Sequence, residues 1–376
     1  MSRVIVRRSS YHADKLKPHI FEMMSSFGTD AIRTGMRVLV KPNFLSPASP
    51  DDGLLTHPAV VRAVCEYLLQ KGASVTVGDS PAMGSFEKIL RDNGIRDALA
   101  GLDVKVEEFS SSAKVDIGEP FGRIDMAEEA LRADRVINLP KLKTHSQMLL
   151  TLGVKNCFGC IAGFRKAEWH MRAGVNHEMF ARLLVQIHRA VNPSLTILDG
   201  IIALEGPGPG RGGIPRHLGV LMASDSALAV DVTVCRMLGI DPETLPTNRV
   251  ARQMGLLPEQ IEIEGILPGV EDFKIPGATS LVYGPKPFQG FVRRHLTRRP
   301  VADDDLCALC GDCTTFCPAG AIGDKGKKLR FDYDRCIRCY CCIEVCPKGA
   351  LRTAESFPAA LFRKLIQKKD APGRKS

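Results

Sequence analysis

Two runs of cysteines near the end of the chain have the residue types and spacing needed to hold iron–sulfur clusters. Each run reads Cys-x-x-Cys-x-x-Cys-x-x-x-Cys-Pro, and the runs begin at Cys307 and Cys336. In such a run the first three thiolates ligate one cluster, whereas the cysteine before proline ligates the other. We therefore expect two [4Fe–4S] clusters. The ligand sets are Cys307, Cys310, Cys313 and Cys346 for the first cluster, and Cys336, Cys339, Cys342 and Cys317 for the second.

The cysteine pattern is similar to that of bacterial two-cluster ferredoxins. Zinc and disulfides are the alternatives. Zinc takes four ligands in two pairs, so it does not explain the third cysteine and the Cys-Pro step of each run. Disulfides fit poorly, because the N-terminal stretch MSRVIVRRSSYHADK lacks the apolar region of a secretory signal. The pattern therefore predicts a ferredoxin-like electron-transfer module over residues 303–352.

The composition indicates a globular protein with more than one domain. The chain has 376 residues, of which 44% are hydrophobic and 25% charged, and this is typical of globular proteins that bury a large core. No segment approaches the ~18 consecutive apolar residues of a transmembrane helix. We therefore expect a cytoplasmic protein without a transmembrane segment. An anaerobic or microaerobic setting is expected, because clusters of this type are often sensitive to oxygen.

The net charge of +9 is concentrated in two segments near the cysteine runs. Residues 286–300 contain five basic side chains and no acidic one, and residues 352–376 contain seven basic and two acidic side chains. We interpret residues 286–302 as a basic linker and 353–376 as a basic tail, with short amphipathic helices at 291–299 and 361–369. These segments are either simply solvated or dock the ferredoxin module or an acidic redox partner, and peripheral membrane contact is the alternative. Aromatic residues make up only 6% of the chain, so we expect no nucleic-acid binding.

The first 285 residues alternate between strand and helix patterns. Strand patterns occur at residues 4–8, 36–40, 74–80, 104–109, 135–140, 194–201, 218–224 and 261–265. Helix patterns occur at residues 14–27, 56–72, 86–100 (interrupted near Gly94), 126–133, 178–190, 227–238 and 248–254, with Thr56 as the expected cap of the second. This alternation predicts an α/β domain with a largely parallel sheet over residues 1–285. The small α+β ferredoxin-like domain follows it.

Polar side chains follow two of the predicted strands. Lys41 and Asn43 come after strand 36–40, and Lys143 and His145 come after strand 135–140. Ligands of open α/β sheets bind at the carboxyl ends of the strands, so we expect these side chains to meet in one site. With two residues of a nearby Gly-rich segment, the expected lining is Lys41, Asn43, Lys143, His145, Lys155 and Asn156.

The types of these residues suit the reduction of a bound anion. Lys143 and Lys155 would supply positive charge where electrons arrive, and the two asparagines would donate hydrogen bonds to a substrate oxygen. His145 titrates near neutral pH, so it is the expected proton donor, with His170 in reserve. The residues expected to bind or orient are Lys41, Asn43, Asp199 and Asp231. The alternative is that the lysines form ordinary ion pairs with Asp79, Asp199 and Asp231, and that nothing binds.

Two further motifs have a structural and a functional interpretation. Gly208-x-Gly210-x-x-Gly213 fits the dinucleotide pattern, but Pro209 lies within it and a strand follows where a helix is required. We expect a rigid turn there, with an anion-binding loop as the alternative. Cys157 and the cysteine three residues later form a Cys-x-x-Cys motif. We interpret this motif as a buried structural pair, with a redox couple as the alternative.

A set of short motifs resembles the domain-of-unknown-function 362 family. The motifs are VKPNF, THPAVVRAV, VGDSP, NLPKLKTH, GVKNCFG, ILDGI, EGPGP, ASDSALAVD and IEIEG, within residues 36–285. The resemblance implies an α/β domain associated with iron–sulfur redox chemistry and often fused to a ferredoxin module. The motif residues that it highlights are Lys41, Asn43, Lys143, Thr144, His145, Lys155, Asn156, Asp199 and Asp231.

These features together predict an iron–sulfur oxidoreductase. Electrons would pass through the two clusters to a small anionic or carbonyl-bearing substrate in the α/β domain, with reduction of a C=C bond as the favoured reaction. A redox partner protein would donate the electrons, and a flavin is left open as a further cofactor. The alternatives are an electron carrier that docks redox partners and an accessory protein that handles clusters or metals.

Overall fold

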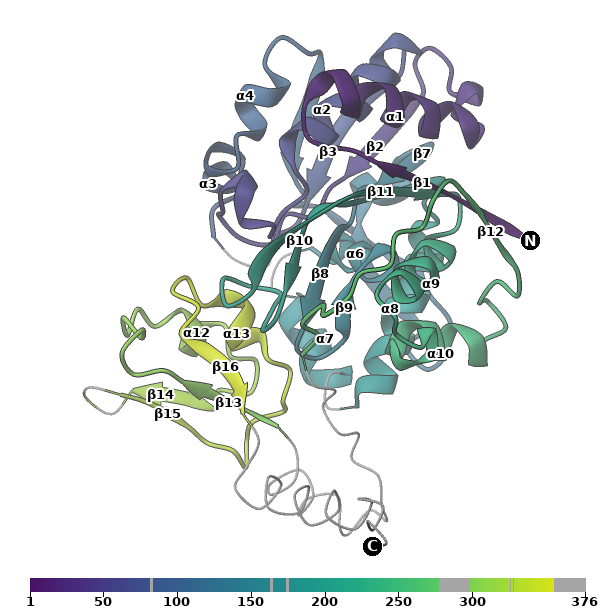
Figure 1. Ribbon diagram of the computed structural model, residues 1–376. Coiled ribbons are helices and arrows are strands. Elements are labelled where there is room, and N and C mark those ends of the chain that lie inside the picture. Colours follow the sequence, from purple (N-terminus) through teal and green to yellow (C-terminus); the bar gives the residue numbers. More distant parts are fainter. Residues whose placement is uncertain are drawn as a thin grey trace, which may run out of the picture.

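The computed structural model describes residues 1–81, 84–162, 165–173, 176–276, 298–324, 326 and 328–354 (Figure 1). The basic tail expected at 353–376 and the linker expected at 286–302 lie mostly outside the described residues. The amphipathic helix expected at 361–369 lies wholly outside them, and the one expected at 291–299 almost wholly.

A mixed, mostly parallel sheet forms the centre of the first domain. Its strand order is β12-β1-β11-β10-β7-β2-β3-β4, and β8 and β9 extend it beside β10. Only β11 and β9 run antiparallel to their neighbours. The α/β fold predicted from the alternation of elements is therefore confirmed. The strands are β1 (Ser2–Arg8), β2 (Arg37–Lys41), β3 (Ser74–Asp79), β4 (Val104–Glu108), β7 (Arg135–Asn138), β8 (Lys141–His145), β9 (Leu149–Thr151), β10 (Leu195–Glu205), β11 (Ile214–Ser224) and β12 (Ile261–Glu264).

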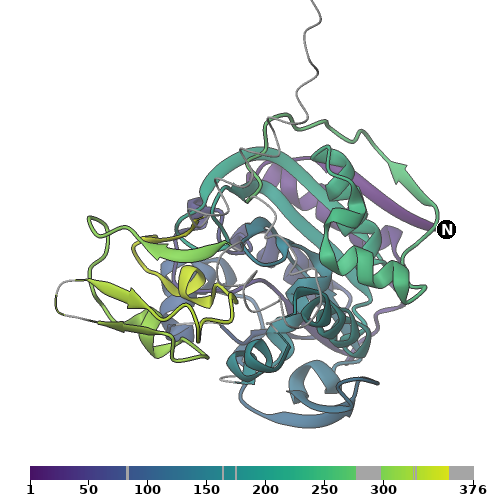
Figure 2. The same cartoon turned by 90° about the horizontal axis from the view of Figure 1, so that it is seen from below.

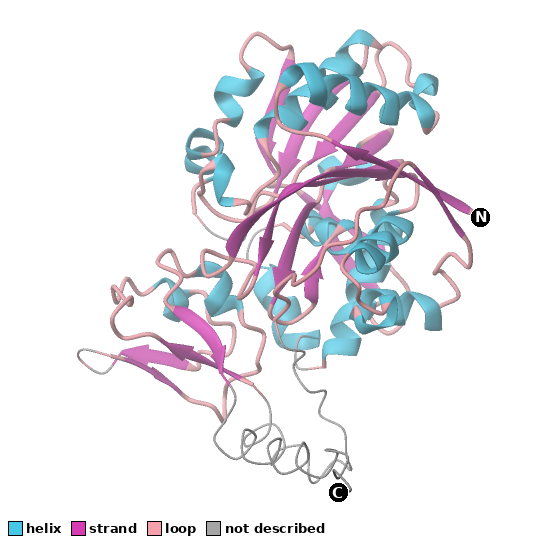
Figure 3. Cartoon of the chain, in the orientation of Figure 1, coloured by secondary structure: helices cyan, strands magenta, loops and turns pink. Residues whose placement is uncertain are grey.

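Helices cover both faces of this sheet (Figure 3). Side chains of a strand alternate between the two faces, and the core clusters follow this rule: Val38 and Val40 of β2 join one cluster, whereas Leu39 joins another. The first face carries α1 (Ala13–Ser26), α2 (Pro58–Gln70), α3 (Phe86–Asp92) and α4 (Ile95–Leu99). The second face carries α8 (His177–Val191), α9 (Ala227–Met237) and α10 (Pro246–Gln253).

The predicted cap of α2 is wrong by one residue. The N-cap is His57, whose Nδ1 accepts a hydrogen bond of 3.1 Å from the Ala59 amide. The Thr56 hydroxyl instead accepts a bond of 2.8 Å from the Asn43 amide and donates one of 2.6 Å to the Leu139 carbonyl. Thr56 therefore ties the segment after β2 to the segment after β7, and this bond positions the candidate site.

Three further expectations about the elements need correction. The helix expected at 126–133 covers only α5 (Glu128–Arg132), because the preceding residues form β6 (Arg123–Ala127), which pairs with β5 (Ser112–Asp116) in a small separate sheet. The segment that carries Lys143 and His145 does not follow a strand but is itself strand β8. Asp199 lies near the middle of the eleven-residue strand β10 rather than at its end. The buried lysines and histidine of β8 hide its strand character from a hydrophobicity pattern, whereas β10 was predicted as a strand but is longer than expected.

The ferredoxin-like module has short strands, short helices and its own core. It consists of β13 (Arg299–Ala302) paired with β16 (Leu351–Ala354), β14 (Ile322–Asp324) paired with β15 (Leu329–Phe331), and the helices α12 (Asp312–Thr315) and α13 (Cys341–Val345). The module begins at β13, inside the segment that we expected to be linker. Figures 1 and 2 both place it at one side of the α/β domain.

The helices of the described residues include none that is both long enough and apolar enough to cross a membrane.

Candidate functional site

The eight cysteines of the two runs group into the crossed sets expected from their spacing. One cavity is lined by the first ligand set, which is Cys307, Cys310, Cys313 and Cys346. A second cavity is lined by the second ligand set, which is Cys317, Cys336, Cys339 and Cys342. The backbone repeats as well, because Leu309 and Arg338 occupy the same position in each run and both have a positive φ, at 51° and 61°. These tight turns bring the three sequential thiols of each run to one side of a loop.

The donor sets fit polynuclear clusters better than single ions. Among the residues that the structure describes, no group of three or more suitable side chains converges on a single metal ion. The four thiols of each ligand set instead enclose a space between them, as a cubic cluster requires. The two sets differ in exposure. Cys310 of the first set is exposed, whereas Cys336, Cys339 and Cys342 of the second set are buried.

A larger cavity of about 330 Å³ lies between the ferredoxin module and the α/β domain. Residues of α13 and the residue after α12 form one wall, and the ends of β2, β3, β8 and α6 (Gly153–Asn156) form the other. The module contributes Phe316, Cys341, Glu344 and Val345. Phe316 and Cys341 are sequence neighbours of ligands in the second set, and Cys341 also contacts Cys339 of that set, whereas only Val345 adjoins a ligand of the first set.

A glycine-rich loop holds the two modules together at this cavity. The loop is the segment after β10 that carries the dinucleotide-like pattern. A Cβ on Gly210 would lie 2.9 Å from the backbone oxygens of both Ile343 and Glu344, so only glycine lets α13 approach this closely. On its other side, the Ser146 hydroxyl donates a 2.9 Å bond to the Gly208 carbonyl. The loop is thus a packing surface for α13, which agrees with the rigid turn expected from the sequence.

A second contact between the modules joins His145 and Glu344. Nε2 and Oε1 lie 2.7 Å apart, although the ring N–H does not point along this line and both atoms lack a well-directed hydrogen bond. We therefore treat the pair as an electrostatic contact. Nδ1 of His145 accepts bonds from the amides of Gln147 and Met148 at 3.0 and 3.1 Å. The ring is thus a neutral imidazole with its proton on Nε2, and burial lowers the pKa of His145 to about 4.

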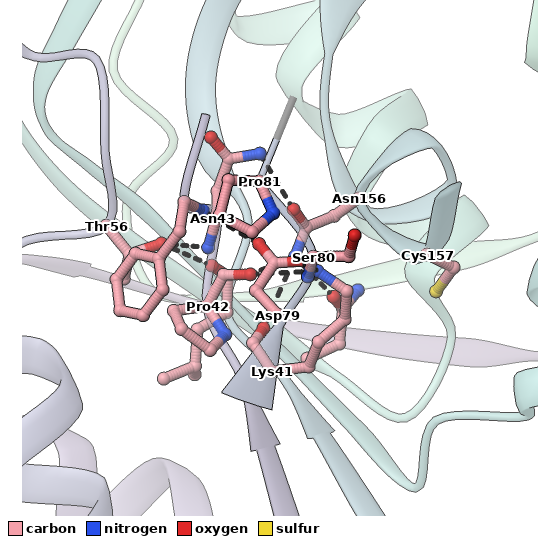
Figure 4. Close-up of polar contacts among 12 residues, drawn as sticks. Lys41, Pro42, Asn43, Thr56, Asp79, Ser80, Pro81, Asn156 and Cys157 are labelled. Carbon is pink, nitrogen blue, oxygen red and sulfur yellow. Dashed lines mark hydrogen bonds and ion pairs between the residues drawn. The ribbon is translucent and has the colours of Figure 1, made fainter. Parts of the chain in front are cut away.

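Two of the predicted site residues are bound in buried ion pairs. Lys41 Nζ lies 2.8 Å from Asp79 Oδ1, and both side chains are almost completely buried (Figure 4). A Cβ on Gly159 would lie 2.2 Å from Asp79 Oδ1, so the glycine makes room for this pair. Asp199 pairs in the same way with Lys141 at 2.8 Å. The alternative in which lysines form ordinary ion pairs therefore holds for Lys41, and the partner of Asp199 is a lysine that the sequence did not highlight.

Asp231 has a purely structural position. Its carboxylate accepts hydrogen bonds of 2.8 and 3.2 Å from the amides of Gly153 and Val154. These are the first residues of α6, so Asp231 fixes the helix that carries Lys155. Neither Asp231 nor Asp199 lines the cavity.

A chain of three asparagines anchors Lys143 at the cavity. Lys143 Nζ donates to Asn43 Oδ1 at 2.7 Å, and Asn43 Nδ2 donates to Asn156 Oδ1 at 2.8 Å (Figure 4). Asn156 Nδ2 in turn donates to Asn138 Oδ1 at 2.8 Å, and Asn138 Nδ2 donates to the Gly153 carbonyl at 3.0 Å. Each amide is therefore oriented by its neighbour. Asn43 and Asn156 hold Lys143 in place.

Three lysines at the cavity have no carboxylate partner at ion-pair distance among the described residues. Lys143 donates to Asn43 and to the Leu54 carbonyl at 2.9 Å. Lys166 donates to the carbonyls of Ser80 and Pro81. Within the described part of the chain, Lys155 has neither a hydrogen-bond nor an ion-pair partner, and it keeps some surface open to the cavity. This leaves positive charge available to a bound anion.

Burial makes these lysines weaker bases than a lysine in water. Burial, assisted by the charge of Lys155, lowers the pKa of Lys143 from 10.5 to about 7. Burial lowers the pKa of Lys166 to about 8 and also lowers that of Lys155. Lys143 therefore carries a proton that it can release near neutral pH.

The predicted histidines separate in space. His170 of α7 (Arg165–Ala173) lines the cavity, is buried, and has no partner for its Nδ1 among the described residues. Burial lowers the pKa of His170 to about 4. His145 is fully buried and does not line the cavity. Of the two histidines predicted as proton donors, His170 therefore lines the cavity and His145 does not.

The Cys-x-x-Cys motif lies behind the cavity wall. Cys157 and Cys160 are fully buried and free in the short helix Cys157–Cys160. Burial raises the pKa of Cys160 to about 12 and also raises the pKa of Cys157 well above its usual value. Such thiols are poor nucleophiles, so the buried-pair interpretation has the better support.

Sequence reasoning missed several residues of the cavity. Glu344, Cys341 and Phe316 come from the ferredoxin module, and no spacing rule connects them to a site in the other domain. One signal was available: Glu344 is an acidic residue in an otherwise apolar turn between two cluster ligands, Cys342 and Cys346. Lys166 also lines the cavity, and nothing in its spacing along the chain placed it there.

The fold and the cysteine sites thus define an α/β domain joined to a ferredoxin-type iron–sulfur module. Comparison with known families agrees. Residues 38–236 match the family described as Domain of unknown function (DUF362), and residues 299–347 match a 4Fe-4S dicluster domain. The chain belongs to the DUF362 family, as its motifs indicated, and carries an iron–sulfur electron-transfer domain.

One curated relative and two solved structures are similar to this chain. The relative is Thylakoid-associated protein sll1697 of Synechocystis sp., which is 39% identical over 261 residues, or 69% of this chain and 81% of the relative. A Thermotoga maritima protein is 14% identical with a TM-score of 0.34, covering 56% of this chain and 54% of its own. The lactate racemase apoprotein of Thermoanaerobacterium thermosaccharolyticum is 11% identical with a TM-score of 0.35, covering 53% and 50%. This chain spans about half the length of both structures.

Proposed function

We propose that the protein is an iron–sulfur oxidoreductase that reduces a small anionic or carbonyl-bearing molecule in the cavity between its two modules. One observation carries the proposal. The same cavity is lined by lysines without carboxylate partners and by residues next to the ligands of the second set. Positive charge and a source of electrons therefore meet at one place, as the reduction of an anion requires.

Two clusters, when bound, supply two electrons one at a time. Residues next to ligands of the second set line the cavity, whereas Cys310 of the first set is exposed, so a cluster held by the second set would be the one that delivers electrons to the cavity. This order suits entry of electrons at the first cluster, from a low-potential redox partner protein, and delivery from the second. Two electrons and two protons convert a C=C or C=O bond into its saturated product.

Different lysines bind the substrate and transfer the proton. Lys155 faces Glu344 and Cys341 across the cavity, so its charge stabilises the reduced substrate closest to the second cluster. Lys143 is the better proton donor than His145, because it lines the cavity and its pKa lies near 7. His170 also lies at the cavity wall and is the alternative proton donor. Asn43 and Asn156 position Lys143, and Lys41 and Asp79 build the wall.

The compartment follows from the need for reduced thiols. All thirteen cysteines are free, and the eight of the cluster runs function only as thiolates. A reducing, cytoplasmic location fits this requirement. A relative described as thylakoid-associated makes peripheral membrane contact the alternative.

Reoxidation of the reduced protein tests the proposal. The anaerobically purified protein is reduced chemically and mixed with candidate acids and ketones, and the iron–sulfur absorbance is followed in a stopped-flow instrument. We expect at least one compound to reoxidise the clusters, and Lys155→Gln to slow this step at least tenfold without changing the cluster spectra. Lys114→Gln is the matched control, because Lys114 is exposed on β5 outside the cavity. If every compound fails while a partner protein exchanges electrons equally well with wild type and Lys155→Gln, the protein is an electron carrier.

A further inference from the structure

The balance of charge in the cavity limits what it can bind. The lining contains four lysines and three carboxylates: Lys41, Lys143, Lys155, Lys166, Asp79, Glu108 and Glu344. Lys41 and Asp79 neutralise one another at 2.8 Å. With all four lysines protonated and all three carboxylates ionised, the lining therefore carries one net positive charge. A ligand with one negative charge restores neutrality, whereas a nucleotide or another polyanion would bring excess charge against Glu344.

Apart from the charged side chains and a few polar ones, the cavity has apolar and aromatic residues on both of its walls. Phe44 and Phe158 of the α/β domain are buried at 2% and 7% exposure, and Phe316 belongs to the ferredoxin module. Pro209 and Val345 complete this surface. Aromatic side chains favour flat, apolar partners at their faces and edges. The body of the ligand is therefore apolar, and a planar body suits it best.

The size of the cavity excludes large cofactors as substrates. Its volume of about 330 Å³ is at the small end of the range of ligand sites. A molecule with one ring and a short side chain fits this volume, whereas a coenzyme thioester does not.

The position of the charges sets the orientation of the ligand. The charge of Lys155 acts directly on Lys143, whereas Lys166 is bound to the carbonyls of Ser80 and Pro81. Lys155 also lies close to Cys341, which is flanked by ligands of the second set. An acid group between Lys143 and Lys155 is thus held on the side of the second cluster.

We propose that the substrate is a small planar monocarboxylate in which an apolar, ring-sized group is conjugated to the acid through a C=C bond. This inference rests on the proposed function and specifies its substrate class. Two electrons from a low-potential carrier protein, passed through the clusters, and two protons break the C=C π bond and form two C–H bonds. Lys143 supplies one proton and solvent the other. The carboxylate is unchanged and stays bound to Lys143 and Lys155.

Binding to the oxidised holoprotein tests the substrate class separately from turnover. Isothermal titration calorimetry under anaerobic conditions compares cinnamate with four probes that each lack one feature. These are cinnamamide, which has no charge; crotonate, which has no ring; 3-phenylpropanoate, which has no C=C bond; and fumarate, which has two charges. We expect cinnamate to bind at least tenfold more tightly than cinnamamide, because one charge-assisted hydrogen bond contributes about a factor of ten. It should also bind at least tenfold more tightly than crotonate and fumarate, because neither has a ring-sized apolar group to bury, and more tightly than the non-planar 3-phenylpropanoate.

A variant and a turnover assay complete the test. Lys155→Gln should weaken cinnamate binding roughly tenfold but leave cinnamamide binding unchanged, while Lys114→Gln leaves both unchanged. The reduced protein should convert cinnamate to 3-phenylpropanoate, detected by NMR. Equal binding of cinnamate and crotonate, or no binding of cinnamate while another acid reoxidises the clusters, overturns the substrate class and leaves the proposed function standing. Selective binding of cinnamate with no reoxidation by any acid overturns the proposed function instead.

Discussion

The ion pair between Lys41 and Asp79 gives a sharp prediction about stability. Asp79→Asn removes the carboxylate that pairs with Lys41 while keeping the shape of the side chain. Lys41 Nζ then keeps only the Pro42 carbonyl, at 2.9 Å, as a described partner. Both side chains are at most 4% exposed, and breaking a buried pair by removing one partner costs about 3–5 kcal/mol. We expect Asp79→Asn to lower the free energy of unfolding by that amount.

Two further variants decide the cause of this loss. Asp134→Asn breaks the pair of Arg37 and Asp134, whose side chains are 61% and 35% exposed, so solvent screening should make its cost much smaller than that of Asp79→Asn. The double variant Lys41→Met with Asp79→Asn removes both buried charges and should recover more than half of the loss. Chemical denaturation followed by circular dichroism measures all three under anaerobic conditions. If Asp79→Asn costs no more than Asp134→Asn, Lys41 is not held by Asp79 and is free to bind substrate.

Three other predictions follow from the site. Gly210→Ala would place a Cβ about half an ångström too close to the backbone of α13, so it should slow reoxidation of the clusters by substrate about tenfold. The control Gly269→Ala should leave this rate unchanged, because its new Cβ meets nothing within 4 Å. Equal rates for the two variants would contradict the packing role of the loop. The pKa of Lys143 is lowered from 10.5 to about 7 in the folded state. Between pH 7 and 10.5 the unfolded chain therefore binds one more proton than the folded protein, so the free energy of unfolding should rise by about 1.4 kcal/mol per pH unit. Lys143→Met should flatten this slope in pH-dependent denaturation curves, and an unchanged slope refutes the assignment. Cys317→Ser should alter the electron paramagnetic resonance signal of the second cluster while retaining that of the first, and loss of only the first signal would reverse the ligand sets.

Short-range patterns explain what the sequence predicted well. The cysteine runs are local loops, so their spacing determines which thiols meet, and the crossed grouping is also the one found around the two cavities. The α/β fold was predictable for the same reason, since strand and helix patterns are read within a single element. Motifs such as VKPNF and GVKNCFG carried the family assignment.

Side-chain pairing across the sheet was not predictable from the sequence. Whether Asp199 meets Lys141 depends on the register of β10 against β8, where these residues are directly paired. The role of His145 depends on the turn after β8, whose amides occupy Nδ1 and fix the tautomer. Spacing along the chain carries neither piece of information, so the expected proton donor moved from His145 to Lys143 once the contacts were known.

The cavity exists only where the two modules meet, and this explains why the chain carries both. The α/β domain supplies Lys143 and Lys155, which in the proposed function would lower the energy of a bound anion as it gains an electron. The ferredoxin module supplies Cys341 and Glu344 on the opposite wall, directly beside the second ligand set. A ferredoxin docking from solution would have to reproduce this close packing at each encounter, whereas the covalent fusion and the loop at Gly210 maintain it. In the proposed function, this fixed packing would let the electron reach the substrate next to Lys143 and Lys155, which have no carboxylate partner at ion-pair distance in the described part of the chain.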